Sequence, residues 1–357
     1  MREPRSTARR LALLGVAIEM AAWSGLVVFY DRAWLQPNAV RGNLDQWLGD
    51  VVRGRSAAPY QYRVLAPHVI MWINGHSSLG IERASLVLDV SAMIVGALAA
   101  HWMFVSLGMR WAAVAGAFYG SFLGIGLLWW GKPEAMPAFA AATVLCAVLC
   151  VPTERRWVIV ALAALVLAGT RTDLLGAFAV AWTARWWVGR RTADLVGGVS
   201  LGALAAVATE ALKHAFPQAR YPAGIGMIQI FHNFQPTTAL IATAFLLPSI
   251  GPLVVARHDP AAVDELDRHH LLLFPIGLLV AAEVGFALVF GRIDEVRLLF
   301  PLTAPLTLIA ALSGRALLRA LGLQMGDATD VALAEVGPVQ RVPAHNPAEG
   351  RRPTLQR

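Results

Sequence analysis

The sequence is poor in charged residues and has almost no cysteine. Asp, Glu, Lys and Arg make up 15% of its 357 residues and apolar residues 57%, whereas soluble globular chains average about 25% charged and roughly 45–50% apolar residues. This composition excludes a soluble domain and a disordered chain. Cys146 and Cys150 stand four positions apart in one apolar run, a spacing poorly suited to a disulfide within one helix.

Motifs of the common enzyme classes are missing as well. No phosphate-binding loop, dinucleotide fingerprint, zinc-protease motif or Ser-His-Asp signature occurs. The formal net charge is +7, but its arginines stand at the ends of apolar runs and form no stripe or motif typical of nucleic-acid binding. We therefore expect the lipid bilayer as a partner, and no nucleic acid.

Ten apolar runs predict an all-α, polytopic integral membrane protein. The arginines are more frequent in alternate gaps, which predicts a cytoplasmic N-terminus at 1–10 and a transmembrane domain at 11–313. A first outer loop at 31–80 and a mostly disordered cytoplasmic tail at 314–357 complete the predicted organisation. The predicted spans are 11–30, 81–107, 111–130, 135–151, 157–169, 174–188, 195–212, 236–256, 271–290 and 298–313.

Two neighbouring predicted spans, 157–169 and 174–188, are shorter than the roughly 20 helical residues that cross a bilayer. Either these helices extend through the link Thr170–Asp173, or the link lies at membrane depth, where protein must satisfy its polar groups. Short paired segments of this kind indicate a binding site.

The predicted outer gaps combine acidic and basic residues in compact groups. Arginine offers donors that fit phosphate, and a carboxylate can take a proton from an acceptor hydroxyl. This mixture suits group transfer from a lipid-linked phosphate donor. For any single residue a structural ion pair at a span end is the more common explanation, and the face as a whole is better evidence than any one of its members. The candidate substrate-binding residues are Lys132, Glu134, Arg171, Asp173, Glu295 and Arg297.

Three acids fall inside predicted spans: Glu19, Asp89 and Glu283. A carboxylate in hydrocarbon is costly, so each one is a functional candidate by default. Asp89 and Glu283 suggest a transport path at the midplane, whereas a hydrogen-bonded carboxyl that joins two helices is the structural alternative. No residue set predicts a metal site or a cofactor.

Three short motifs resemble those of known membrane proteins. The run Tyr60–Pro67 is similar to a "YR-V/I-L-x-P" signature of bacterial polytopic proteins, and Glu295–Arg297 with Pro301 and Pro305 is similar to their "E-x-R…P…P" segment. Thr170–Asp173 resembles the "T-R-x-E/D" of GT-C glycosyltransferases. The resemblance extends over about 22–313.

The resemblance to GT-C enzymes implies a multi-span fold and a polyprenyl-phosphate-linked sugar donor. It also implies that Asp31, just after the first span, is the catalytic base, and that Arg63, Arg171 and Arg297 contact the donor phosphate. The expected location is the bacterial cytoplasmic (inner) membrane, with both termini in the cytoplasm and a role in cell-envelope assembly.

Three functions remain open from the sequence. The first is glycosyl transfer to an outer-face acceptor, the second is a transporter or lipid flippase that uses Asp89 and Glu283, and the third is a non-catalytic membrane subunit. These patterns do not determine whether the chain is an enzyme or whether it needs a divalent metal. They also do not determine which sugar and acceptor it would use.

Overall fold

The computed structural model describes residues 43–57, 60–109, 112, 116, 135–151, 156–219, 230–290 and 298–322. Within these residues every regular element is a helix, and no strand occurs. The elements are α3 (Asn43–Val52), η2 (Tyr60–Tyr62), α4 (Leu65–His76), α5 (Gly80–Ser106), α7 (Ala135–Cys150), α8 (Arg156–Ala168), α9 (Thr172–Gly189), α10 (Thr192–Ala215), α11 (Ile230–Asn233), α12 (Pro236–Ala256), α13 (Pro260–Arg268), α14 (His270–Phe290), η4 (Phe300–Leu302) and α15 (Thr303–Ala320).

Five helices of the described part are long and apolar enough to cross a membrane: α5, α10, α12, α14, and η4 together with α15. Helices α7 and α8 are apolar but shorter, with 16 and 13 residues. The all-helical class is therefore confirmed, together with helices of membrane type. The predicted spans at 11–30 and 111–130 lie outside the described residues, apart from Ala112 and Gly116.

Two boundaries differ from the prediction. Helix α15 continues past Ser313 to Ala320, so the first residues of the predicted tail are helical. The predicted first outer loop contains α3, η2 and α4. Helix α3 was missed because its apolar residues are too few to signal a span. Leu48 and Val51 are nevertheless fully buried, so tertiary packing supports this helix.

Helix α7 is the centre of the bundle and is buried along almost its whole length. It packs against α5, α8, η4 and α15. The ring of Phe139 on α7 lies 4.9 Å from that of Phe300, centroid to centroid. Gly96 on α5 allows this packing, because a Cβ atom added there would lie 2.4 Å from the Phe139 ring.

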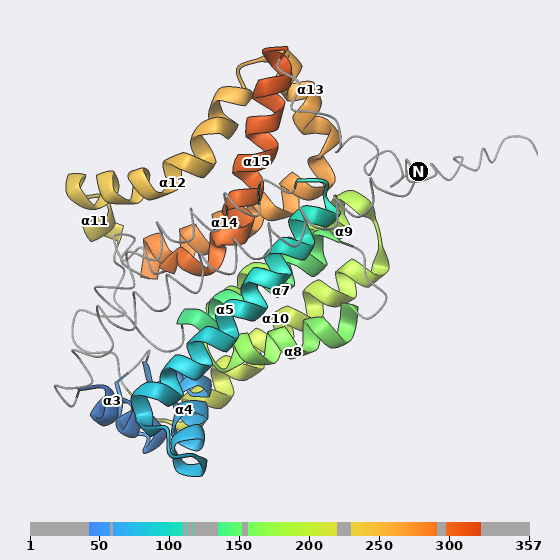
Figure 1. The fold of residues 1–357 in the computed structure, drawn as a ribbon. Helices are drawn as coiled ribbons and strands as arrows, with labels where there is room; N and C mark the ends of the chain where they lie inside the picture. The colour runs from blue at the N-terminus through green and yellow to red at the C-terminus, as the bar shows by residue number, and fades with distance from the viewer. Residues whose placement is uncertain are drawn as a thin grey trace, which may run out of the picture.

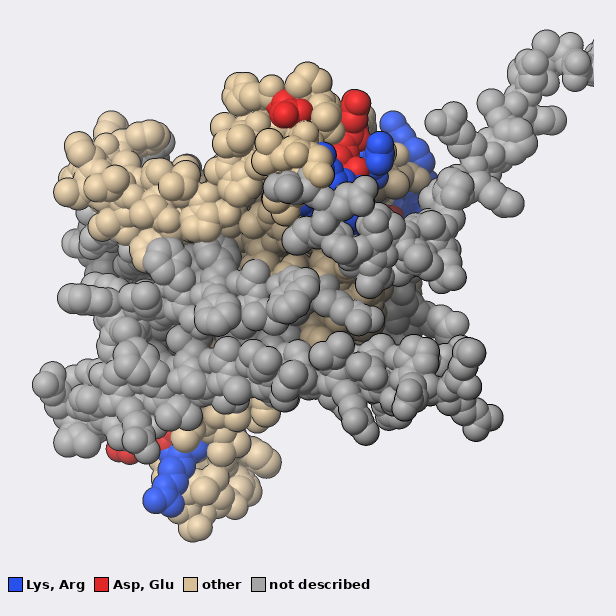
Figure 2. All heavy atoms as spheres, turned by 45° about the horizontal axis from the view of Figure 1, so that its top comes forward, with Lys and Arg blue, Asp and Glu red and all other residues tan. Residues whose placement is uncertain are grey.

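The outer surface of the bundle is also apolar. Leu162 on α8, Val199 on α10 and Leu240 on α12 are 62%, 62% and 71% exposed. Large apolar side chains over several helices mark a surface that contacts lipid or another protein. On the face drawn in Figure 2, the visible charged side chains of described residues gather in two separate groups.

Helices α5, α7, α8, α9 and α10 run side by side, and α12, α13 and α15 lie to one side of them (Figure 1). Helices α3 and α4 lie together at one end of the molecule, and α13 lies at the other. The buried charges described next lie at the two ends of α9, where it follows α8 and where it precedes α10.

Candidate functional site

The link between α8 and α9 is buried inside the protein. Thr170 and Arg171 are 2% and 6% exposed, and Arg171 has a non-helical backbone conformation (φ −145°, ψ 80°). The Thr170 hydroxyl donates a hydrogen bond of 2.7 Å to the Val166 carbonyl. The two helices therefore do not merge through this link, which is enclosed by protein instead.

Arg171 holds two carboxylates that are far apart in the sequence. Its Nε donates to both Asp173 oxygens at 2.9 Å, and its Nη2 donates to Asp173 Oδ2 and to Glu283 Oε1 at 2.5 Å each. Glu283 comes from α14, which packs against α9, and its side chain is 1% exposed. Charge-assisted contacts of this length are the strong class of protein hydrogen bonds.

The segment around Arg63 is joined directly to this link. The Leu65 N–H donates a hydrogen bond of 2.9 Å to the Gly169 carbonyl. Gly169 permits the approach, because a Cβ atom there would lie 2.7 Å from the Leu65 Cβ. Arg63 is half-buried, and its guanidinium interacts electrostatically with the Asp173 carboxylate. We call Arg63, Arg171, Asp173 and Glu283 the Arg171 cluster.

Side-chain hydrogen bonds fix the loop that carries Arg63. Gln61 is fully buried; its Nε2 donates to the Val51 carbonyl at 2.8 Å, and its Oε1 accepts from the Ser56 N–H at 2.8 Å. The Tyr62 hydroxyl donates to the Ala219 carbonyl at 3.2 Å. The loop is thus attached both to α3 and to the segment after α10.

The charges of the Arg171 cluster balance, with two arginines and two carboxylates. Arg171 and Glu283 are buried and Arg63 and Asp173 are half-buried; burial of ionisable groups is costly unless their geometry is good, and the contacts of Arg171 meet that condition. Glu283 Oε2 is buried and has no hydrogen-bond partner within the described part of the chain. The cluster therefore keeps one buried acceptor that a ligand hydroxyl could use.

The structure brings together Arg63, Arg171 and Asp173 from the predicted outer gaps, and it adds Glu283, which the sequence assigned to a separate midplane path. Asp89 is buried on α5, 2% exposed. The other predicted site residues lie outside the described residues: Asp31, Lys132, Glu134, Glu295 and Arg297.

Two further buried acids, Asp194 and Glu265, were not among the site residues predicted from the sequence. Asp194 is fully buried between Arg156, whose Nη1 is 3.7 Å from Oδ1, and Arg185, whose Nε is 3.5 Å from Oδ2. The signal in the sequence was a single acid among several arginines at the ends of three predicted spans.

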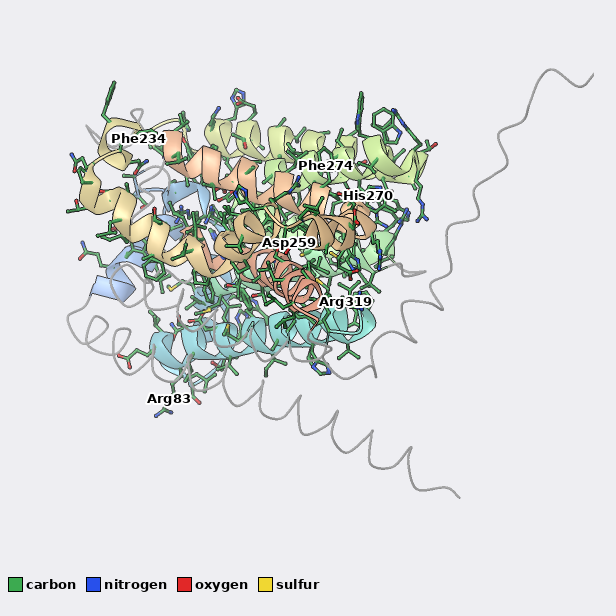
Figure 3. All side chains as sticks on the ribbon, turned by 90° about the horizontal axis from the view of Figure 1, so that it is seen from above. Arg83, Phe234, Asp259, His270, Phe274 and Arg319 are labelled. Carbon is green, nitrogen blue, oxygen red and sulfur yellow. The ribbon has the colours of Figure 1, made fainter. Side chains whose placement is uncertain are left out.

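Glu265 on α13 is the other missed acid, 4% exposed. Its carboxylate contacts Arg268 at 3.1 Å, His269 at 3.5 Å, Arg315 at 3.9 Å, and Arg319. Burial lowers the pKa of His269, and the Glu265 carboxylate opposes that shift. These contacts hold α13 to α15 at the end of the molecule seen in Figure 3, where Arg319 and Asp259 are labelled.

The aspartate before α13 has a local structural role. Asp259 Oδ1 accepts hydrogen bonds from the N–H groups of Ala261 and Ala262 at 2.9 and 3.2 Å, which caps the helix. Across the described ranges, no group of three or more His, Cys, Asp or Glu side chains could hold a metal ion.

Comparisons of the chain with protein-family models, curated proteins and solved structures found no match.

Proposed function

We propose that the protein is a membrane glycosyltransferase-like enzyme that transfers a sugar from a polyprenyl-phosphate donor to an acceptor on the outer face of the membrane. The proposal includes ten spans with GT-C-like architecture, a location in the bacterial inner membrane, both termini in the cytoplasm, and a role in the cell envelope. The Arg171 cluster forms part of the donor site.

One observation carries the proposal: two segments that resemble family motifs, Tyr60–Pro67 and Thr170–Asp173, meet at the hydrogen bond between Leu65 and Gly169. At this contact the chain buries arginines and carboxylates. Apolar side chains of similar volume would often stabilise a fold equally well. Ionisable residues in a membrane bundle are therefore candidates for function.

The proposed roles follow from exposure and charge. Arg63 is more exposed than Arg171, so it contacts the donor phosphate and stabilises the charge that develops there. Arg171 is held by Asp173 and Glu283, and through these contacts it fixes the position of the link between α8 and α9. Asp31 takes the proton of the acceptor hydroxyl as that oxygen attacks the anomeric carbon, and the polyprenyl phosphate leaves with the electrons of the broken C–O bond. Further donor contacts come from Lys132, Glu134, Glu295 and Arg297.

The test uses purified protein in liposomes that contain polyprenyl-phosphate sugars, with release of polyprenyl phosphate followed by mass spectrometry. Arg63→Ala is expected to lower the release rate by about 100-fold, the usual effect of removing one charge-stabilising donor. The matched control is Arg53→Ala, because Arg53 lies in the same loop, is 55% exposed and pairs with Asp50 at 3.5 Å. Equal rates in the two variants would contradict the proposal, as would absence of release from every donor in stably folded protein.

A transporter or lipid flippase is the second candidate. The observation that favours it is the buried Glu283 Oε2, which has no hydrogen-bond partner among the described residues, within a helix long and apolar enough to span a membrane. This function predicts flux across the liposome membrane without cleavage of the donor, and loss of flux in Glu283→Gln and Asp89→Asn. If all these variants change stability alone, the protein is a non-catalytic subunit.

A further inference from the structure

Three helix ends meet at a second site that the proposed function does not use. Helix α8 begins at Arg156, α9 ends at Gly189 and α10 begins at Thr192. At their junction Arg156 and Arg185 contact the buried carboxylate of Asp194, and Arg190 and Arg191 form the link between α9 and α10. We call these five residues the Asp194 cluster.

This cluster has more positive charge than its acid neutralises. The ion pairs of Arg156 and Arg185 with Asp194 are long, at 3.7 and 3.5 Å. Arg156 and Arg191 both act repulsively on the Arg185 guanidinium. No hydrogen bond joins any of the four arginines to a described side chain or carbonyl through its guanidinium, so their donors remain for an anion. Arginine donors fit phosphate oxygens particularly well.

Tryptophan side chains orient two of these arginines. The Arg156 guanidinium lies 4.7 Å from the centroid of the Trp157 ring, and that of Arg190 lies 4.8 Å from the centroid of Trp187. Stacking uses the flat face of a guanidinium and leaves its N–H edge for another partner. Trp157 and Trp187 are 41% and 60% exposed, as is typical of rings at a membrane–water interface.

The backbone at Arg190 is strained in a way that favours a role for this side chain. Arg190 is the residue that follows α9 and has a left-handed conformation, φ 54° and ψ 23°. Glycine is the usual residue in this position because it has no Cβ. A long, charged side chain there is exposed beside Arg191, at the surface of the cluster.

Below the arginines the surface of α8 and α10 is apolar. Val158 and Leu162 on α8 are 63% and 62% exposed, and Val196 and Val199 on α10 are 55% and 62% exposed. The two helices pack against each other, and α10 is long and apolar enough to span a membrane. A phosphate bound by the arginines would therefore sit above a surface that suits acyl chains.

We propose that the Asp194 cluster binds the phosphate headgroup of an anionic phospholipid, with the acyl chains along α8 and α10. The arginines supply charge and hydrogen bonds, and Asp194 holds Arg156 and Arg185 in place between the three helix ends. The lipid fixes the junction of these helices at the membrane surface. This site is separate from the Arg171 cluster and does not depend on glycosyl transfer.

The test compares thermal unfolding of the full chain in detergent with added phosphatidylglycerol, phosphatidylcholine or inorganic phosphate, and detects bound lipid by native mass spectrometry. We expect phosphatidylglycerol alone to raise the unfolding midpoint and to remain bound. The double variant Arg190→Ala/Arg191→Ala should weaken its apparent affinity by about fivefold for each arginine removed. The control for each arginine removed is Arg257→Ala, because Arg257 is exposed at the end of α12 and its loss removes one positive charge from outside the cluster.

A second variant separates binding from folding. Arg190→Gly removes the side chain and relieves the left-handed backbone, so it should leave the midpoint without lipid unchanged or higher while it weakens the response to phosphatidylglycerol. Three results would overturn the proposal: equal responses to phosphatidylglycerol and phosphatidylcholine, an equal loss in Arg257→Ala, or a full response to inorganic phosphate, which would indicate a site for soluble anions.

Discussion

The two ends of α9 carry the same residue types in opposite electrostatic arrangements. At its start, Arg171 binds Asp173 and Glu283 with contacts of 2.5–2.9 Å, and the charges of the cluster balance. Near its end, roughly 20 Å further along the helix axis, Arg185 and Arg156 lie 3.5 and 3.7 Å from Asp194, and positive charge is in excess. The first arrangement is a closed ion network, whereas the second remains open to an anion.

Arg171→Ala should have the largest effect on stability. It leaves the carboxylates of Asp173 and Glu283 buried without their common partner, which typically costs about 3–5 kcal/mol. The measurement is the free energy of unfolding in a denaturant titration of the detergent-solubilised protein. Arg53→Ala, an exposed arginine in an ion pair, should change it by about 0–1 kcal/mol. Similar losses in the two variants would refute the view that the Arg171 cluster is a closed network.

Gly169→Ala should separate the loop of Arg63 from the link that carries Arg171. The new methyl group would lie 2.7 Å from the Leu65 Cβ, so one of the two segments must move, at a cost of about 1–3 kcal/mol. The control is Gly176→Ala within α9, where a Cβ atom meets nothing within 4 Å and alanine favours the helix. The prediction fails if both variants are as stable as the natural sequence.

Asp194→Asn should lower the free energy of unfolding by about 1–2 kcal/mol, less than Arg171→Ala. The ion pairs of Asp194 are longer than those of Arg171, and the arginines that form them are partly exposed. The loss comes mainly from repulsion among arginines at the helix junction. Salt screens charges near the surface more than buried ones, so high ionic strength should restore much of the stability of Asp194→Asn and little of that of Arg171→Ala. Unfolding measured at low and high salt distinguishes the two clusters, and equal salt responses would contradict the comparison.

The sequence predicted the long helices better than the clusters. Helix α12 has the predicted limits and α5 and α14 begin one residue earlier, because the length of an apolar run largely defines a membrane helix. Arg171 and Asp173 were predicted together since they are close in the chain. Glu283 stands 112 residues from Arg171, and only the packing of α14 on α9 joins them, so no local pattern could reveal that pair.

The smallest expected effect is the pH dependence that His269 contributes at the α13 end. Burial, opposed by the Glu265 carboxylate and reinforced by Arg315 and Arg319, lowers the pKa of His269 below its usual value of 6.5. The folded protein therefore binds a proton here less readily than the unfolded chain. The contribution of this group to stability is complete above pH 6.5 and is lost as the pH falls through the lowered pKa.

His269→Gln should flatten this part of the curve of unfolding free energy against pH, whereas His258→Gln, which changes an exposed histidine, should not. Identical curves for His269→Gln and the natural sequence would show that burial of His269 does not oppose its protonation.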